Sequence, residues 1–509
     1  MKQLTTVLIA NRGEIALRVQ AACHARGLRT IAVFAPEDKQ LRYVAQASAA
    51  YPLSGSGFSA YLNQEELIAI ARLAGADAVH PGYGFLAENA VFAQRVTDAG
   101  LTWIGPAAHV IAAMASKEQA RKIAQRAGVS VLPASVVLDL SSAGASAAAQ
   151  AAERIGYPVI IKDPLGGGGK GMRRVLAPQD FPAAWEQVVV EATKQTKTTS
   201  LIIEKYILAG RHIEVQIAGD GNAVVHLFER ECSLQRRHQK IIEEAPALFI
   251  SDATKQELYA AACRLARMVQ YDSIGTVEFV VAPDESWYFL EMNTRLQVEH
   301  GVTELTTGLD LVDLQLTLAQ TEHLPLQQES IRQHGHAIQC RLYAEDPEHN
   351  FMPAAGTIQL LALPQHPFLR IEHDLHAGAV VSPFFDPMIA KFITFGPTRA
   401  YAQQVMQYAL AHACFHGLTT NALFLRNLLA APFFAQGAFH TQLLADRDLV
   451  RTLAADLPLE HVEGEANAAE LQLAGLAVAL LGYAQGQEKS QHESLPGAQQ
   501  RRWKEQQWW

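Results

Sequence analysis

The pattern of apolar and polar positions at the start of the chain predicts parallel strands joined by helices. Apolar runs at 7–10 and 30–34 enclose a helical segment that ends before Gly27. One apolar face of that helix follows the i, i+4, i+7, i+8 spacing and consists of Ile15, Val19, Ala22 and Cys23. A second helix-strand pair follows at 65–80. The first hundred or so residues are therefore expected to form a doubly wound α/β domain.

The pattern changes twice along the rest of the chain. Helices are predicted near 116–127 and, despite its Ser/Ala-rich composition, from 141 to about 155, followed by a strand at 158–162. Short β-like segments dominate 336–395. Two helices then follow, at 398–413 and 420–429, and the last part comprises an apolar helix at 468–483 and a polar, poorly ordered segment at 484–507.

Composition and charge narrow the class of protein. Hydrophobic residues make up 49% and no apolar run approaches the ~18 residues needed to span a bilayer, so no membrane partner is expected. The 42 basic and 51 acidic residues give a net charge of −9, which argues against a nucleic-acid surface. The five cysteines are few and widely spaced, and the first residues enter a strand without a leader pattern. A cytoplasmic location is expected.

The segment at 288–300 carries the densest candidate chemistry. If it stayed extended, one face would present Glu291, Asn293, Arg295, Gln297 and Glu299. The alternative is an edge strand with a solvated polar face.

A second strand, at 276–281, carries Glu278, and a turn at 283–286 would bring it antiparallel to 288–292. Glu278 and Glu291 would then lie close together, which makes most sense with a cation between them. Two carboxylates and the Asn293 amide oxygen suit Mg²⁺ that bridges phosphates. The sequence thus favours a metal-nucleotide site.

Two further segments are ambiguous. The glycine run at 166–169, between Lys162 and Lys170, could cover phosphates as a lid or be a flexible loop, and it matches neither common nucleotide fingerprint. Residues 229–244 could be a solvated charged helix or a polyanion site. The basic residues of that second segment are Arg236, Arg237, His238 and Lys240.

These motifs together resemble the biotin carboxylase family. The matching segments are ANRGEIALR at 10–18, HPGYGFLAEN at 80–89, GGGGKGMR at 166–173, ERECSLQRRHQK at 229–240 and EMNTRLQVEH at 291–300, and AEDP at 344–347 and FFDPMIAK at 384–391 extend the similarity to about residue 447. The resemblance implies a mixed α/β fold in four parts. These are a Rossmann-like N-terminal domain at 1–115, an ATP-grasp domain at 116–330 with a mobile lid at about 134–206, a β-rich biotin carboxylase C-terminal domain at 331–447, and a helical extension with a polar tail at 448–509.

The resemblance also implies an activity and assigns residues to it. The family members are ADP-forming ligases that carboxylate the biotin of a carrier protein through carboxyphosphate, the first half-reaction of an acyl-CoA carboxylase. The catalytic residues would be Glu299, Arg295, Arg341 and Lys240. Bicarbonate would be held by Lys240, Arg295, Gln297 and Val298, biotin by Arg341 and Tyr83, and Mg²⁺ or Mn²⁺ by Glu278, Glu291 and Asn293. ATP would contact Lys117, Lys162, Gly167, Gly168, Met172, Glu204, Lys205, Ile207, His212, Gln235, His238, Glu278 and Glu291.

Partners and rival functions follow from what the sequence contains. It has no Met-Lys-Met biotin acceptor, so biotin would come from a separate biotin carboxyl carrier protein or domain, with a carboxyltransferase subunit downstream and a homodimer or larger complex as the assembly. The rivals are another ATP-grasp carboxylate ligase and a nucleotide-binding assembly subunit without turnover. Four positions depart from the family pattern: Asp163, which could pair with Lys162 and weaken nucleotide binding, and Ala115, Gly301 and Gln339.

Overall fold

The computed structural model describes residues 3–135, 138–140, 142–162, 172–195, 200–237 and 239–455. Within these ranges no helix is both long and apolar enough to cross a membrane. The predicted helix at 468–483 and the polar segment at 484–507 lie outside the described residues.

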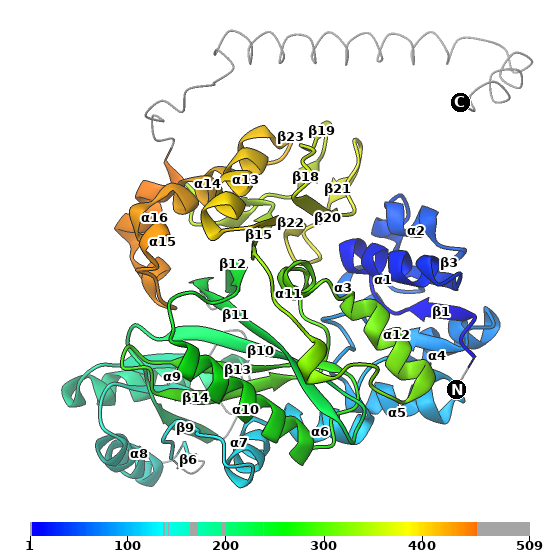
Figure 1. Cartoon of the computed structure of the whole chain (residues 1–509). Coiled ribbons are helices and arrows are strands. Elements are labelled where there is room, and N and C mark those ends of the chain that lie inside the picture. The colour runs from blue at the N-terminus through cyan, green and yellow to red at the C-terminus, as the bar shows by residue number, and fades with distance from the viewer. Residues whose placement is uncertain are drawn as a thin grey trace, which may run out of the picture. The chain divides into compact units, whose positions relative to one another are not determined.

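A five-stranded parallel sheet forms the N-terminal part, in the order β3-β2-β1-β4-β5. Its strands are β1 (Thr6–Ile9), β2 (Arg29–Phe34), β3 (Ala49–Pro52), β4 (Ala78–His80) and β5 (Thr102–Trp103). Its helices are α1 (Gly13–Ala25), α2 (Arg42–Gln46), α3 (Gly57–Ala60), α4 (Gln64–Leu73), α5 (Ala90–Asp98) and α6 (Ala108–Ala115). Val7 packs in the core beneath α1, whereas its neighbour Leu8 packs in the core beneath α4 and α5. Figure 1 shows these helices on opposite sides of β1, so the doubly wound prediction is confirmed.

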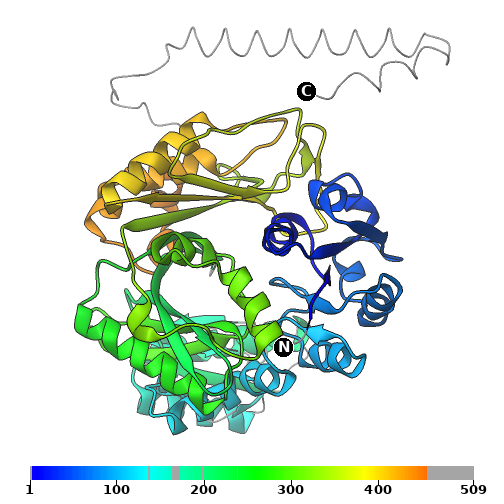
Figure 2. The same cartoon turned by 45° about the vertical axis from the view of Figure 1, so that its right-hand side comes forward.

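An eight-stranded sheet carries most of the candidate site, in the order β14-β13-β10-β11-β12-β15-β22-β20. Its strands are β10 (Arg211–Gly219), β11 (Val224–Arg236), β12 (Gln239–Ala245), β13 (Ile274–Val281), β14 (Trp287–Asn293), β15 (His336–Tyr343), β20 (Leu369–His373) and β22 (Met388–Gly396). Strand β12 pairs directly with β15, which lies about 90 residues later in the chain. The colour of the sheet, which marks residue number, therefore changes from green to yellow in Figures 1 and 2. The sheet therefore contains strands from both sides of the predicted domain boundary at residue 331. It does not mark that boundary, so the domain limits remain predictions.

Helices cover this sheet and join it to the N-terminal part. They are α7 (Lys117–Arg126), α10 (Asp252–Met268), α11 (His300–Thr307) and α12 (Leu311–Thr321). The core beneath α10 includes Leu258 and Leu265 with Val215 of β10 and Phe279 of β13. Helix α12 packs against α1 in a core that also reaches the C-terminal strands. The candidate site is thus held between elements of distant parts of the chain.

The segment predicted as the lid has a sheet and a core of its own. Its strands run in the order β6-β9-β7-β8, and these are β6 (Leu138–Asp139), β7 (Val159–Lys162), β8 (Met172–Val175) and β9 (Ser200–Lys205). The helices α8 (Ser142–Ile155) and α9 (Phe181–Gln195) cover it. Trp185, Val188 and Ile203 lie in a hydrophobic cluster separate from the other cores. The prediction that the Ser/Ala-rich segment is a helix is confirmed.

The C-terminal part adds short strand pairs and helices, as predicted. The pairs are β16 (Glu345–Asp346) with β17 (Met352–Pro353), β18 (Gly356–Thr357) with β21 (Val380–Val381), and β19 (Leu360–Ala362) with β23 (Cys414–His416). The helices are α13 (Arg399–His412), α14 (Ala422–Ala430), α15 (Pro432–Gln436) and α16 (Arg447–Ala454). This arrangement leaves β15 and β22 facing the N-terminal part across a cavity.

Candidate active site

The hairpin of β13 and β14 places two carboxylates opposite each other. Glu278 and Glu291 are paired in register, as the turn at 283–286 predicted. Glu278 is buried and accepts hydrogen bonds from the amides of Asn293 and Gln297, each at 2.8 Å. Burial and the charge of Glu278 raise the pKa of Glu291. Like charges facing each other destabilise a hairpin, so this pair suits a bound cation.

The rest of the motif is not extended, so that part of the prediction is wrong. Strand β14 ends at Asn293, and residues 294–299 form a loop that leads into α11. Arg295 donates to Glu88 at 2.8 Å and to the Asn293 amide oxygen at 3.0 Å. The loop still brings Gln297 and Glu299 to the carboxylates of the sheet, although by tertiary contacts and not by alternation.

The polar segment at 229–244 is a buried hairpin of β11 and β12, so the alternative of a solvated helix is wrong. The ammonium of Lys240 contacts three carboxylates: Glu214 at 2.5 Å, Glu278 at 2.8 Å and Glu299 at 2.8 Å. Burial alone would lower the pKa of Lys240, but these three carboxylates outweigh it and raise that pKa well above its usual range.

The other basic side chains of this hairpin have structural partners. Arg236 is buried and pairs with Glu345 at 2.5 Å, and Arg237 donates to the Asn350 side chain at 2.7 Å. Gln235 donates to the carbonyl of Cys232 within the same strand. The interpretation of Arg236 and Arg237 as anion ligands has no support from these contacts, and His238 lies outside the described residues.

Arg341 on β15 bridges two carboxylates beside Lys240. It donates to Glu243 at 2.5 Å and to Glu299 at 3.0 Å, and Gln339 also donates to Glu243 at 3.0 Å. Burial favours protonation of Glu299, but Lys240, Arg341 and Arg230 outweigh it and hold the pKa of Glu299 well below its usual range. Glu299 is therefore an ionised carboxylate between two cations, and it can accept a proton.

The donors on this sheet fit a divalent cation. Glu278 and Glu291 supply carboxylate oxygens, and the Asn293 amide oxygen has a second lone pair besides the one that Arg295 occupies. Hard oxygen ligands of this kind are those that Mg²⁺ takes when it also binds phosphates. A cavity of about 320 Å³ is lined by Glu291 and Asn293, and also by Lys117 and Glu88. A metal-phosphate group has room next to these ligands.

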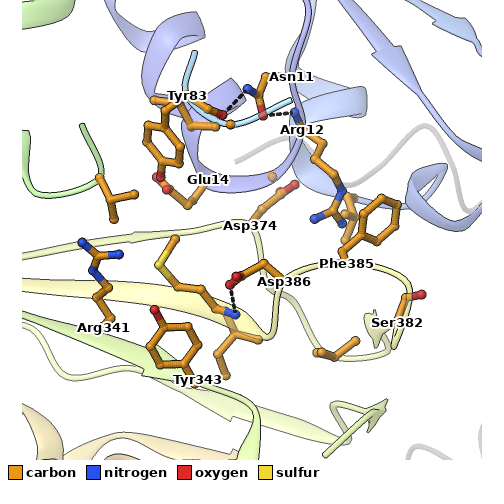
Figure 3. Close-up of a pocket in the computed structure, with 18 of the residues that line it drawn as sticks. Asn11, Arg12, Glu14, Tyr83, Arg341, Tyr343, Asp374, Ser382, Phe385 and Asp386 are labelled. Carbon is orange, nitrogen blue, oxygen red and sulfur yellow. Dashed lines mark hydrogen bonds between the residues drawn. The ribbon is translucent and has the colours of Figure 1, made fainter. Parts of the chain in front are cut away.

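A larger cavity of about 430 Å³ lies between the N-terminal part and strands β15 and β22. Figure 3 shows Tyr83 and Glu14 on one wall and Arg341 and Tyr343 on the other. Arg295 and the Val298 segment also line it. The predicted biotin residues Tyr83 and Arg341 thus line the same cavity as two of the predicted bicarbonate residues, Arg295 and Val298.

The predicted ATP residues fall into two groups. His212 contacts Glu278 at 3.1 Å and belongs with the eight-stranded sheet. On the four-stranded sheet, Lys162 forms an ion pair with Glu204, which also accepts from Arg121 of α7 at 3.0 Å. Lys205 donates to the carbonyls of Gly156 and Tyr157, Met172 pairs in register with Lys162, and the Ile207 carbonyl accepts from Gln442. Gly167, Gly168 and Asp163 lie outside the described residues.

Two buried residues were missed by the sequence reasoning. Arg230, whose side chain is fully buried, donates to Glu214 at 2.5 Å and to Gln297 at 2.8 Å, and so joins β10 to the loop. Glu214 lies opposite Glu278 across β10 and β13. The available signal was the alternation of His212, Glu214 and Gln216 along a strand next to Glu278.

Comparisons with known proteins agree with this geometry. Family models match in three consecutive segments: "Biotin carboxylase, N-terminal domain" at 3–111, "Carbamoyl-phosphate synthase L chain, ATP binding domain" at 116–327 and "Biotin carboxylase C-terminal domain" at 339–446. Biotin carboxylase 2 of Bacillus subtilis is 44% identical over 442 residues, which cover 86% of this chain and 99% of that protein. The mitochondrial methylcrotonoyl-CoA carboxylase subunit alpha of Dictyostelium discoideum is 42% identical, and the match covers 87% of this chain but 63% of that subunit.

Solved structures give the same result. The biotin carboxylase domain dimer of Hydrogenobacter thermophilus 2-oxoglutarate carboxylase, in complex with MgADP, ADP and bicarbonate, superposes with a TM-score of 0.84 at 39% identity, covering 89% of this chain and 99% of that one. A biotin carboxylase-ATP complex from Campylobacter jejuni superposes at 0.83, with 39% identity, covering 87% and 99% of the two chains. The chain therefore belongs to the biotin carboxylase family, whose enzymes are ADP-forming ligases that carboxylate biotin with ATP and bicarbonate.

Proposed function

We propose that the cluster around Lys240 and Glu299 is where this chain activates bicarbonate. The observation that carries the proposal is the contact of one ammonium with three carboxylates next to Arg295 and Arg341. Bicarbonate would bind to Lys240, Arg295, Gln297 and the backbone of Val298. A bound anion would share these cations with Glu299, which raises the pKa of Glu299 and makes it a better base.

The reaction then proceeds by transfer of the γ-phosphoryl group. Glu299 removes the bicarbonate proton, the bicarbonate oxygen attacks the γ-phosphorus, and ADP leaves as carboxyphosphate forms. Carboxyphosphate decomposes to CO₂ and phosphate in the closed site. The phosphate so released takes the proton of the ureido nitrogen of biotin, and that nitrogen then attacks CO₂, while Arg341 donates to the ureido oxygen and stabilises the negative charge that develops there. Tyr83 lines the wall along which biotin enters.

The nucleotide would lie between the predicted ATP residues on the eight-stranded sheet and those on the four-stranded sheet. Glu278, Glu291 and Asn293 would hold Mg²⁺, with Mn²⁺ as an alternative ion, and that ion would neutralise charge on the phosphates. Lys162 leaves Glu204 for a phosphate when ATP binds, since both compete for one ammonium. Gly167, Gly168, Met172, His212, Gln235 and His238 complete the predicted ATP contacts, and Glu204, Lys205 and Ile207 surround the adenine.

The proposed reaction requires partner proteins, and the cysteines bear on the location. Biotin would arrive on a separate carrier protein or domain, and a carboxyltransferase subunit would transfer the carboxyl group to an acyl-CoA, as the names of the acyl-CoA carboxylase relatives suggest. A homodimer is supported by the dimer named for the Hydrogenobacter domain. All five cysteines are unpaired, which supports a reducing compartment and therefore the cytoplasm.

Release of ADP from the purified chain with Mg-ATP tests the proposal. We expect release that needs bicarbonate and rises with free biotin, and we expect Glu299→Gln to slow it by about 10² or more. Glu65→Gln, an exposed carboxylate distant from the cluster, is the matched control. Tight ATP binding without release would favour an assembly subunit, and release without bicarbonate would favour another carboxylate ligase.

A further inference from the structure

A lysine outside the proposed site is fully buried next to the bicarbonate loop. The side chain of Lys391, on β22, exposes none of its surface. Its ammonium donates to the carbonyl of Val298 at 3.1 Å and pairs with Glu372 at 2.6 Å and Glu14 at 3.2 Å. The ammonium thus donates one hydrogen bond to a carbonyl and forms ion pairs with two carboxylates. Such a buried cation is costly unless it is paired in this way.

The three acceptors come from three different parts of the chain. Glu14 lies in the first turn of α1, Val298 in the loop before α11, and Glu372 on β20. Within the sheet, Lys391 is in register with Arg341 on one side and Glu372 on the other. One row of the sheet therefore carries both the arginine proposed to bind biotin and the lysine that contacts the bicarbonate loop.

Three consecutive carbonyls of this loop, at 296–298, each accept a hydrogen bond from a side chain. Arg295 donates to the carbonyl of Leu296 at 3.2 Å, and Nδ1 of His300 donates to that of Gln297 at 2.7 Å. Burial lowers the pKa of His300 to about 4, so the ring is neutral and its Nδ1 carries the hydrogen that this bond needs. Both donors belong to the loop or to the helix that follows it. Lys391, 93 residues further along the chain, holds Val298 and thereby ties the loop to the C-terminal strands.

We propose that Lys391 is a positioning residue that sets the backbone of Val298 and the carboxylate of Glu299 for bicarbonate. The inference rests on the proposed role of this loop and adds what fixes its geometry. Lys391 acts through the Val298 carbonyl and does not contact the reacting atoms. A shift of about 1 Å in such a loop is enough to cost much of the rate.

Steady-state kinetics of Lys391→Met test the proposal. Methionine keeps the length of the side chain but removes all three donors. We expect the KM for bicarbonate to rise about tenfold or more and kcat to fall, while the KM for ATP changes by less than about threefold. Lys391→Arg should not rescue, because a planar guanidinium does not reproduce three diverging donors. A Lys391→Met enzyme that affects both KM values equally, or neither, would overturn the proposal.

Two further variants keep the result interpretable. Arg26→Met is the matched control, since Arg26, directly after α1, pairs with Asp313 of α12 and donates to Thr317 and Gln320, joining two parts of the chain without contact to the loop. Its KM for bicarbonate should stay within about twofold. If Lys391→Met does not fold, Glu14→Gln weakens one of the two carboxylate contacts of Lys391 and should still raise the KM for bicarbonate about threefold, and an unchanged value overturns the proposal. Wild-type activity without bicarbonate dependence would instead refute the proposed function.

Discussion

Individual buried carboxylates in this protein differ sharply in charge state, and their neighbours decide which state each one has. Glu299 lies between Lys240 and Arg341 and stays ionised. Asp374, on the wall of the larger cavity, accepts a hydrogen bond from the backbone amide of Tyr43 at 3.1 Å, but its other oxygen is buried without a partner. Burial raises the pKa of Asp374 to about 7. Both side chains are buried, but the Glu299 carboxylate contacts two cations whereas the Asp374 carboxylate forms no ion pair with any residue that the structure describes.

Asp374 therefore makes stability depend on pH. Its folded pKa of about 7 lies above the ordinary aspartate value of 3.8, so the folded state keeps a proton that the unfolded state loses between these values. Below pH 4 Asp374 is protonated in the folded state and does not lower the free energy of unfolding. As the pH rises its contribution to that free energy falls, and above pH 7 it is roughly 2 to 4 kcal/mol lower than below pH 4. We expect Asp374→Asn to melt close to wild type at pH 4, within about a degree, and a few degrees above it at pH 8. Equal differences at both pH values would contradict this.

Most of these charge states could not be predicted from the sequence. The pairing of Glu278 with Glu291 could be predicted, because a short turn sets the register of the two strands. Arg230 and Lys391 could not, since their partners lie far away along the chain and only the assembled core brings them together. Local spacing reports contacts within a hairpin but not contacts between separate parts of a fold.

At the scale of elements, the β13–β14 hairpin contains a like-charge pair that destabilises it unless a cation binds between the two carboxylates. Two carboxylates face each other across the pair, and Asn293 and Arg295 crowd the same end. Alternation predicted both strands correctly but extended the second one too far. The loop at 294–299 replaces strand geometry because Arg295 and His300 take up carbonyls that a neighbouring strand would otherwise bind. The motif therefore resembled a longer strand than the chain forms.

Replacement of Glu291 should separate stability from ligand binding. Glu291→Gln removes a like-charge contact with Glu278, so we expect the protein in EDTA to be more stable by about 0.5 to 1 kcal/mol. Mg-ATP should bind about tenfold more weakly or worse, because a proposed metal ligand is lost. Wild-type affinity should also fall on acidification, since the raised pKa of Glu291 lets a proton compete with the ion, and this dependence should weaken in the variant.

Melting in EDTA checks the expected gain in stability. Calorimetric titration with Mg-ATP at two pH values checks the expected loss of affinity and its pH dependence. Glu257→Gln is the control, because Glu257 accepts a hydrogen bond from Trp287 of the same hairpin at 2.7 Å but is remote from the metal ligands. A Glu291→Gln protein that is less stable than wild type in EDTA would show that the two carboxylates do not repel each other in the absence of metal.

At the scale of the whole molecule, the described part of the chain combines a continuous eight-stranded sheet with a four-stranded sheet that has a separate core. The first sheet runs through both the ATP-grasp and the C-terminal segments, so these are expected to open together. The second has Trp185 and its neighbours as an independent cluster. Helix α7 reaches it through the Arg121–Glu204 ion pair, and Lys162 pairs with the same carboxylate. A unit joined by a few polar contacts opens more easily than one joined by a shared core.

Hydrogen exchange measures this difference directly. We expect amides of β7 and β9 to exchange through openings that cost at least about 2 kcal/mol less than those of β10 and β13, which lie inside the larger sheet. Mg-ATP should slow exchange in both sheets, but more in β7 and β9, because the nucleotide adds contacts between two units that the free protein holds together by Glu204. In Glu204→Gln without nucleotide, exchange of β7 and β9 should be faster still, while β10 and β13 stay unchanged. Equal protection of the two sheets in the wild type would mean that both belong to one cooperative unit. The four-stranded sheet would then not open separately as a lid.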